Sequence, residues 1–273
     1  MLKHTFCHLP GIGPVKEQHL WDKGITTWEK ALAEFDPSSS PQAGPLPGIV
    51  ASMEKFAQRD AAYFSGLLPP GQQYRLFKPF VNDAVYLDIE TTGLSPWDKI
   101  TTIAMYDGKQ INHYVQGENL DAFANDIKHY ALIITFNGKT FDLPFLRSRL
   151  NCTLDQAHID LRYVLASLGF KGGLKKCEKA MGIDRGDLEG VDGSFAVVLW
   201  DEFQKTQNPK ALETLLAYNI EDVLNLETLM VKAYNLKVKN LAFTAPMPEP
   251  SGLANPFSPD KALVDKLKSL LFF

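Results

Sequence analysis

The chain has 273 residues and is 45% hydrophobic, which is enough for one α/β core and a small accessory module. Its net charge of −4 excludes a protein that is basic throughout, although a local basic patch can still bind phosphate. Three widely spaced cysteines, no CxxC pair and no apolar run long enough for a signal peptide or membrane span predict a cytoplasmic protein without disulfides, zinc sites or membrane contact.

The first 78 residues form two predicted segments. In residues 1–36, apolar residues recur at helical spacing around "PGIGP", which predicts a module of two or three small helices with a tight hairpin. Residues 37–78 are predicted to hold a connecting helix at about 49–66, after a linker over 36–48 that is rich in Pro, Ser and Gly. His4, Cys7 and His8 lie close together, but no further ligands accompany them, so we expect a helix face there.

Residues 79–238 alternate between strand and helix patterns. The stretches "AVYLDIE", "KITTIAMYDG" and "QINHYVQG" predict an antiparallel meander. A helix over 119–130, a buried strand over 131–138, a helix starting at 142–150 and a strand end at 158–161 follow, and residues 161–234 are mostly helical. This order predicts an α/β sandwich with a mixed sheet. Residues 239–273 read as a Pro-rich tail with a short amphipathic terminal helix.

Asp88 and Glu90 stand two residues apart at the end of an apolar strand, in "VYLDIETTGLS". Side chains alternate along a strand, so both carboxylates point to one face and repel each other unless a cation lies between them. Carboxylate oxygens suit hard cations such as Mg²⁺ or Mn²⁺. The alternative is a strand that ends at Leu87 and leaves both acids in solvent.

Two further acids lie on separate elements. Asp142 follows a buried strand and precedes a helix, where the alternative role is a helix N-cap. Tyr218 and Asp222 are four residues apart on a predicted helix and share a face, and the alternative there is a core tyrosine beside a solvated acid.

Taken together, these motifs over about residues 80–235 resemble the DEDD family of 3′→5′ exonucleases, which have the ribonuclease H-like fold with a mixed five-stranded sheet. The D-x-E pair, the Asp after Asn-Gly and the final Y-x-x-x-D are similar to the tyrosine subgroup. "LDIETTGL" and "YNIEDVLNL" most resemble the YprB-like ribonuclease H-like domain proteins.

The resemblance implies two Mg²⁺ or Mn²⁺ ions. Asp88 would bridge both, Glu90 and Asp222 would complete one site, and Asp142 would hold the other through water. Tyr218 would orient the attacking water, because a pKa of about 10 makes tyrosine a poor base.

The resemblance also implies substrate contacts. Four residues of the turn after the acids would contact the terminal nucleotide, namely Thr91, Thr92, Gly93 and Leu94. Asn137 and Phe141 would line the same cleft, or be a turn residue and a core aromatic. The residues that would supply a local positive patch for phosphate are Lys139, Arg147, Arg149, Lys171, Lys175 and Lys176. We expect Asp160 to cap the helix that follows it and His158 to be structural.

The front of the chain, "LPGIGPVKEQHLWDKGI", resembles a helix-hairpin-helix module. Gly11 and Gly13 would form a hairpin whose N–H groups meet a phosphate, with a small helical cap as the alternative. The module is also a candidate docking element for a protein partner. We expect the apolar terminal "KSLLFF" to pack on its own domain, with docking into the groove of a protein partner as the alternative.

We therefore expect a metal-dependent 3′→5′ exonuclease that acts on single-stranded or frayed ends of DNA or RNA. The alternatives are a metal-dependent endonuclease and a non-catalytic nucleic-acid-binding adaptor.

Overall fold

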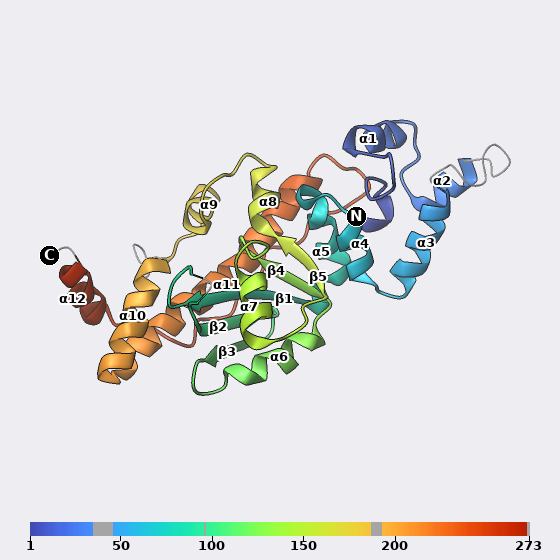
Figure 1. Cartoon of the computed structure of the whole chain (residues 1–273). Coiled ribbons are helices and arrows are strands. Elements are labelled where there is room, and N and C mark those ends of the chain that lie inside the picture. The colour runs from blue at the N-terminus through green and yellow to red at the C-terminus, as the bar shows by residue number, and fades with distance from the viewer. Residues whose placement is uncertain (35–45, 96, 187–192, 272–273) are drawn as a thin grey trace.

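The computed structural model describes residues 1–34, 46–95, 97–186 and 193–271 (Figure 1). Its centre is a five-stranded mixed sheet in the order β3-β2-β1-β4-β5. The strands are β1 (Ala84–Thr91), β2 (Ile100–Tyr106), β3 (Ile111–Val115), β4 (Leu132–Thr135) and β5 (Ala157–Asp160). The first three form the predicted antiparallel meander, and β4 and β5 run parallel to β1. The predicted fold class is confirmed.

Two apolar layers cover the sheet. The long helix α11 (Pro209–Val238) crosses one face, and α6 (Phe123–Asp126) and α7 (Asp142–Leu150) cover the other (Figure 1). Tyr86 of β1 belongs to the core beneath α11, whereas Val85 and Leu87 belong to the core beneath α7. Because side chains alternate along a strand, the even-numbered positions of β1 face α11. This parity sets the direction of Asp88 and Glu90.

The remaining helices pack around this core. The N-terminal region contains α1 (Pro14–Asp22) and α2 (Trp28–Glu34), after a short 3-10 helix at Leu2–His4. The segment before the sheet contains α3 (Leu46–Ala57), α4 (Ala61–Leu67), a 3-10 helix at Pro70–Leu76, α5 (Phe77–Phe80) and a 3-10 turn at Val81–Asp83. Short 3-10 helices at Leu120–Ala122 and Ile127–His129 flank α6. The later helices are α8 (Leu161–Ala166), α9 (Leu174–Ala180), α10 (Gly193–Thr206) and α12 (Lys261–Leu271).

The single helix predicted at about 49–66 is wrong, because two helices occupy this range. Arg59 takes a left-handed backbone with φ of 55°, which ends α3. Asp60 then caps α4 by accepting a hydrogen bond from the N–H of Tyr63 at 3.0 Å. Residues 36–45 of the predicted linker lie outside the described residues. Its last three residues, 46–48, belong to α3, so the linker prediction is wrong there.

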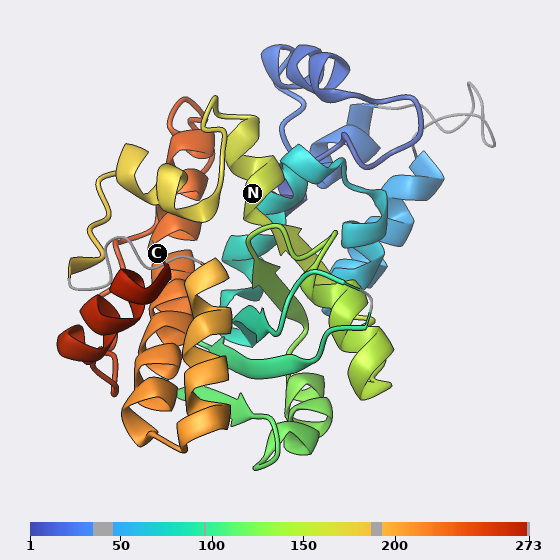
Figure 2. The same cartoon turned by 60° about the vertical axis from the view of Figure 1, so that its left-hand side comes forward.

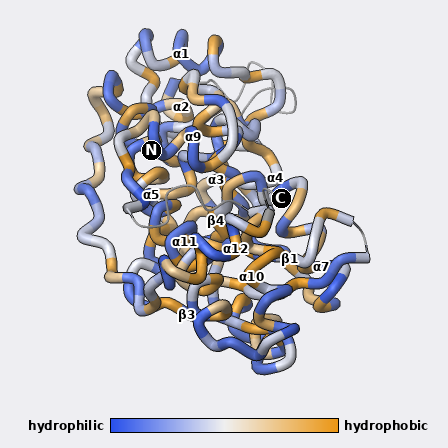
Figure 3. Tube along the Cα trace, turned by 90° about the vertical axis from the view of Figure 1, so that its left-hand side faces the viewer, coloured by the Kyte–Doolittle hydropathy of each residue, from blue (hydrophilic) through white to orange (hydrophobic). Residues whose placement is uncertain are grey.

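The C-terminal helix packs on its own domain. In Figure 2, α12 lies beside α10 and α11, and Leu263, Val264 and Leu267 join the apolar cluster of those two helices. In Figure 3, hydrophobic stretches of the trace lie near β1 and α10, where the sheet and the helices pack against each other. Among the described residues, no helix combines the length and the apolarity that a membrane span needs.

Candidate active site

Three carboxylates from two elements meet on the α11 face of the sheet. Asp88 and Glu90 of β1 and Asp222 of α11 each offer an oxygen, and these oxygens all lie within 4.8 Å of one another. The strand continues to Thr91 and Glu90 is buried, so the alternative of a strand that ends at Leu87 with both acids in solvent is wrong. Of the described residues, no other three His, Cys, Asp or Glu side chains come this close together.

Asp142 lies next to these three acids and is hydrogen-bonded to the backbone of β1 between Asp88 and Glu90. It is the first residue of α7 and is buried, and its Oδ1 accepts a hydrogen bond from the N–H of Ile89 at 3.3 Å. Phe141 occupies the N-cap position, so the N-cap role considered for Asp142 is wrong. The carboxylate ties α7 to β1 next to the three clustered acids.

The electrostatics of the group favour a bound cation. Burial, reinforced by the charges of Asp222 and Asp142, raises the pKa of Asp88 and Glu90 well above the usual range. Burial also raises the pKa of Asp142 to about 7, and it raises the pKa of Asp222 to about 6 against the opposing effect of Arg185. The buried carboxylates repel one another when all are ionised. Their oxygens form a set of ligands that suits a hard divalent cation, whose charge would offset this repulsion.

Tyr218 lies one turn before Asp222 on α11 and is buried. Two cations lie over its ring: the Nζ of Lys175 is 4.9 Å from the ring centroid, and the guanidinium carbon of Arg185 is 5.8 Å from it. Burial and the nearby acids raise the pKa of Tyr218, so its hydroxyl is a neutral donor at physiological pH. This agrees with an orienting role.

Asn219 is a buried site residue that the sequence patterns did not single out. Its Nδ2 donates to Asp88 Oδ2 at 2.7 Å, and its Oδ1 accepts from the hydroxyl of Thr102 on β2 at 3.0 Å. This chain of hydrogen bonds fixes the orientation of Asp88. The only signal in the sequence is a polar residue on the apolar face of a long helix.

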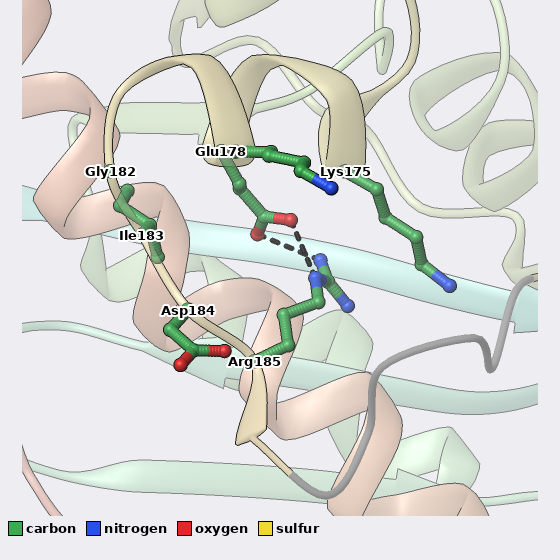
Figure 4. A pocket seen from close by; sticks show the side chains of 7 residues that line it. Lys175, Glu178, Gly182, Ile183, Asp184 and Arg185 are labelled. Atoms are coloured by element: carbon green, nitrogen blue, oxygen red, sulfur yellow. Dashed lines mark hydrogen bonds and ion pairs between the residues drawn. The ribbon is translucent and has the colours of Figure 1, made fainter.

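Arg185 is the second residue that sequence reasoning missed. It comes from the segment after α9, and its Nη2 lies 2.5 Å from Asp222 Oδ1. The same guanidinium holds Glu178 of α9 through Nε at 2.5 Å and Nη2 at 2.7 Å (Figure 4). Glu178, Arg185 and Lys175 line a cavity of about 500 Å³ beside the acids. No periodicity or motif marks Arg185.

The turn after β1 exposes two large apolar side chains. Thr91 is buried and donates to the carbonyl of Gly93, while Thr92 donates to Asp98. Leu94 is 85% exposed and Trp97 is 86% exposed, directly after the acidic strand end. Trp97 is a further exposed aromatic side chain near the acids that the sequence patterns did not single out.

The turn leaves little space beside Gly93. A Cβ placed there would lie 2.6 Å from Asp98 Oδ2, so the Asp98 carboxylate would have to shift. A contact of Thr91, Thr92, Gly93 and Leu94 with a nucleotide stays a prediction.

The turn between β4 and α7 is organised by Asp160. Its carboxylate accepts from the N–H groups of Asn137 at 2.8 Å, Lys139 at 3.1 Å and Arg162 at 3.0 Å, so the predicted cap of α8 is confirmed. Asn137 has a left-handed φ of 68°, as a turn residue does. The partly buried ring of Phe141 packs against that of Phe145, with 5.4 Å between the ring centroids, at the edge of the apolar core beneath α7. Their roles in a substrate cleft stay predictions.

The other predicted residues have local contacts. His158 shares a hydrogen bond with the Thr135 hydroxyl at 2.9 Å, which agrees with a structural role. Gly11 has a left-handed φ of 74°, its carbonyl accepts from Lys16, and Gly13 precedes α1. Arg147 donates to the carbonyl of Leu154 at 2.7 Å.

Of the six basic residues, Lys175 lies beside the acids. Lys139 lies over the Tyr163 ring, and Arg149 over the Phe145 ring. Lys171 lines a separate cavity with Asn137. A phosphate-binding role for this set, as for Gly11 and Gly13, stays a prediction.

Comparison with known proteins places this site in a family. A family model described as the RNase_H superfamily matches residues 85–234, more than half of the chain and the whole stretch from β1 into α11. No curated protein matches. A family B DNA polymerase from the hyperthermophilic archaeon Pyrobaculum calidifontis is similar in structure over 56% of this chain and 29% of that chain, with 15% identity and a TM-score of 0.37. On the family match, this chain belongs to the RNase_H superfamily.

Proposed function

We propose that this protein is a divalent-metal-dependent nuclease of the DEDD type, tyrosine subgroup, which removes nucleotides from the 3′ end of single-stranded or frayed DNA or RNA. The observation that carries the proposal is the meeting of the Asp88, Glu90 and Asp222 carboxylates within 4.8 Å. Membership in the RNase_H superfamily supports nuclease activity in general. The exonucleolytic direction, the YprB-like resemblance and the substrate rest on the sequence motifs.

The chain offers a set of ligands for two Mg²⁺ or Mn²⁺ ions. Asp88, Glu90 and Asp222 would hold them, with Asp142 in support. Bound divalent cations would stabilise the negative charge that develops on the oxygens of a phosphodiester during hydrolysis.

The side chains around the acids have complementary tasks. Asn219 keeps Asp88 in one orientation, because its Nδ2 donates a hydrogen bond to Asp88 Oδ2. The neutral hydroxyl of Tyr218 would donate a hydrogen bond to the attacking water or to a phosphate oxygen, which orients the reacting atoms. Leu94 and Trp97 offer apolar surface on which a terminal base can stack.

The test is a cleavage assay on end-labelled single-stranded DNA and RNA of equal sequence, linear and circular, with Mg²⁺, Mn²⁺ or EDTA. Asp88→Asn keeps the shape of the side chain and should abolish cleavage, whereas Asp121→Asn removes an exposed acid and should leave the rate unchanged. Linear strands should shorten from the 3′ end and circles should survive.

Each alternative has its own outcome in this assay. Cleavage of the circles would replace the exonuclease with an endonuclease. No cleavage of any substrate by the wild type with either metal would favour the non-catalytic adaptor.

The N-terminal region carries a separate proposal. The family match begins at residue 85 and does not extend to the helix-hairpin-helix resemblance. We infer from Gly11, Gly13 and the start of α1 at Pro14 that this region binds a nucleic-acid phosphate or a protein partner. Binding of a labelled oligonucleotide by wild type and by Gly13→Glu, at several salt concentrations, tests the phosphate role.

A further inference from the structure

A buried cation of the protein already lies on one of the three clustered acids. The side chain of Arg185 is 6% exposed, and its Nη2 lies 2.5 Å from Asp222 Oδ1. Arginine stays charged at every pH at which proteins are folded, so this positive charge cannot be removed by deprotonation. Arg185 therefore gives Asp222 a counter-charge, which it shares with Glu178.

A divalent cation and Arg185 would compete for the same carboxylate. Both are attracted to the negative charge of Asp222, and two positive charges on one buried carboxylate repel each other strongly in a medium of low polarity. The charges of Lys175 and Arg185 also favour the ionised form of Glu90. The ion pair that Arg185 forms directly with one of the three clustered acids is the one with Asp222, so direct competition arises at this carboxylate.

Glu178 gives Arg185 a second anchor. It is buried, and it receives two hydrogen bonds from the guanidinium in a fork, as Figure 4 shows. Arg185 can thus lose its contact with Asp222 and remain paired, which avoids the large cost of a lone buried charge. Its third nitrogen, Nη1, is buried and has no hydrogen-bond partner among the described residues, so the side chain has further bonding capacity.

We propose that Arg185 is the resident counter-cation of Asp222, which leaves this carboxylate when a divalent cation binds and thereby weakens metal binding to the site. The inference rests on the proposed function, because it requires that Asp88, Glu90 and Asp222 hold a divalent cation. It adds that Arg185, from the segment after α9, opposes metal binding at Asp222.

The test measures Mn²⁺ affinity by titration calorimetry, without any nucleic acid. Arg185→Met keeps much of the apolar stem and should bind Mn²⁺ about tenfold more tightly than wild type. Removing Arg185 alone also leaves the charge of Glu178, which could attract the ion by itself. The double variant Glu178→Gln with Arg185→Met has the net charge of the wild type and should still bind about tenfold more tightly.

The controls separate the possible explanations. Arg59→Met removes an exposed arginine that pairs with Asp83, away from the three clustered acids, and should leave the affinity unchanged. If the double variant binds Mn²⁺ like wild type or more weakly, Arg185 only holds Asp222 in position, and the proposal is overturned. If wild type binds no Mn²⁺, or if Asp88→Asn binds as well as wild type, the proposed metal site itself is wrong.

A second measurement needs no substitution and so does not depend on the folding of a variant. The Arg185 side-chain signal in ¹⁵N-detected spectra of the wild type should shift as Mg²⁺ is added, with the same midpoint as the calorimetric titration. A signal that stays unchanged at saturating Mg²⁺ would contradict the displacement.

Discussion

Asp88 is oriented by a buried amide. Asn219 donates to it from α11, and Thr102 of β2 holds Asn219 in turn. We expect Asn219→Leu to lower kcat by about 10- to 100-fold and to weaken Mn²⁺ binding, because Asp88 loses its fixed orientation. Thr102→Val should have a smaller effect of the same kind. Kinetics and Mn²⁺ titration measure both.

A matched control for this prediction lies on the same helix. Asn225 is also buried, but its Nδ2 has no hydrogen-bond partner among the described residues. Asn225→Leu should keep kcat near that of wild type. An equal loss in both asparagine variants would mean that the effect is general damage to α11.

The hydroxyl of Tyr218 distinguishes a catalytic role from a core role. Phenylalanine keeps the ring that packs in the α10–α11 core and under Lys175 and removes the hydroxyl alone. We expect Tyr218→Phe to lower kcat by about 10- to 100-fold, because a group that orients the reacting atoms is lost, while Mn²⁺ affinity stays the same. Unchanged kcat would leave Tyr218 as a core tyrosine only.

At the scale of elements, Asp160 links three of them. It holds the turn after β4, the start of α8 and its own place at the end of β5 through three backbone N–H groups. Asp160→Asn replaces one accepting oxygen by a donor that faces an N–H group, so we expect a loss of about 1–3 kcal/mol in the free energy of unfolding. Urea denaturation measures the loss.

The same variant also tests whether Asp160 is a metal ligand. Its carboxylate is occupied by backbone donors and it is not one of the three clustered acids. Mn²⁺ affinity should therefore remain near that of wild type. A large loss of affinity would add Asp160 to the ligands.

The sheet and the clustered acids follow from patterns that a strand shows locally. Alternation along β1 places Asp88 and Glu90 on one face, and the spacing of four on α11 places Tyr218 with Asp222. The helix break at Arg59 carries no Gly or Pro signal, since a left-handed arginine is an exception to local preference. Asn219 contacts Asp88 and Arg185 contacts Asp222, and both partners are far away in sequence, so these contacts leave no periodic pattern.

At the scale of the whole molecule, a buried ion pair joins the N-terminal region to the segment before the sheet. Arg75 donates to Glu17 of α1 at 2.7 and 2.6 Å, and Glu17 also accepts from the N–H groups of Phe6 and Cys7. We expect Arg75→Met to lower the free energy of unfolding by about 3–5 kcal/mol, because it leaves a buried carboxylate uncompensated. Thermal and urea denaturation measure this.

The double variant Arg75→Met with Glu17→Gln should recover part of that loss, because it removes the uncompensated charge. Additive losses would contradict the coupling. Since residues such as Leu2 and Phe6 share one apolar core with Tyr234 of α11, we expect one cooperative transition in each variant, with no separate unfolding of the N-terminal region.

His8 gives this shared core a dependence on pH. It is buried against Trp28 and Phe64, with Nε2 2.7 Å from the Ser52 hydroxyl. Burial lowers the pKa of His8 from 6.5 to about 4, so the folded protein keeps the ring neutral under conditions in which the unfolded chain binds a proton. The unfolded state therefore gains stability as the pH falls from 7 toward 4, and the folded state does not.

We expect this one residue to remove about 1–2 kcal/mol from the free energy of unfolding between pH 7 and pH 5. Other groups titrate in the same range, so the measurement compares wild type with His8→Asn, which lacks the titrating ring, by urea denaturation at both pH values in EDTA. Wild type should lose that amount more than the variant on acidification. Parallel losses in the two proteins would mean that the His8 ring accepts a proton without leaving its place, and that the core shared by the N-terminal region and the sheet is open to water.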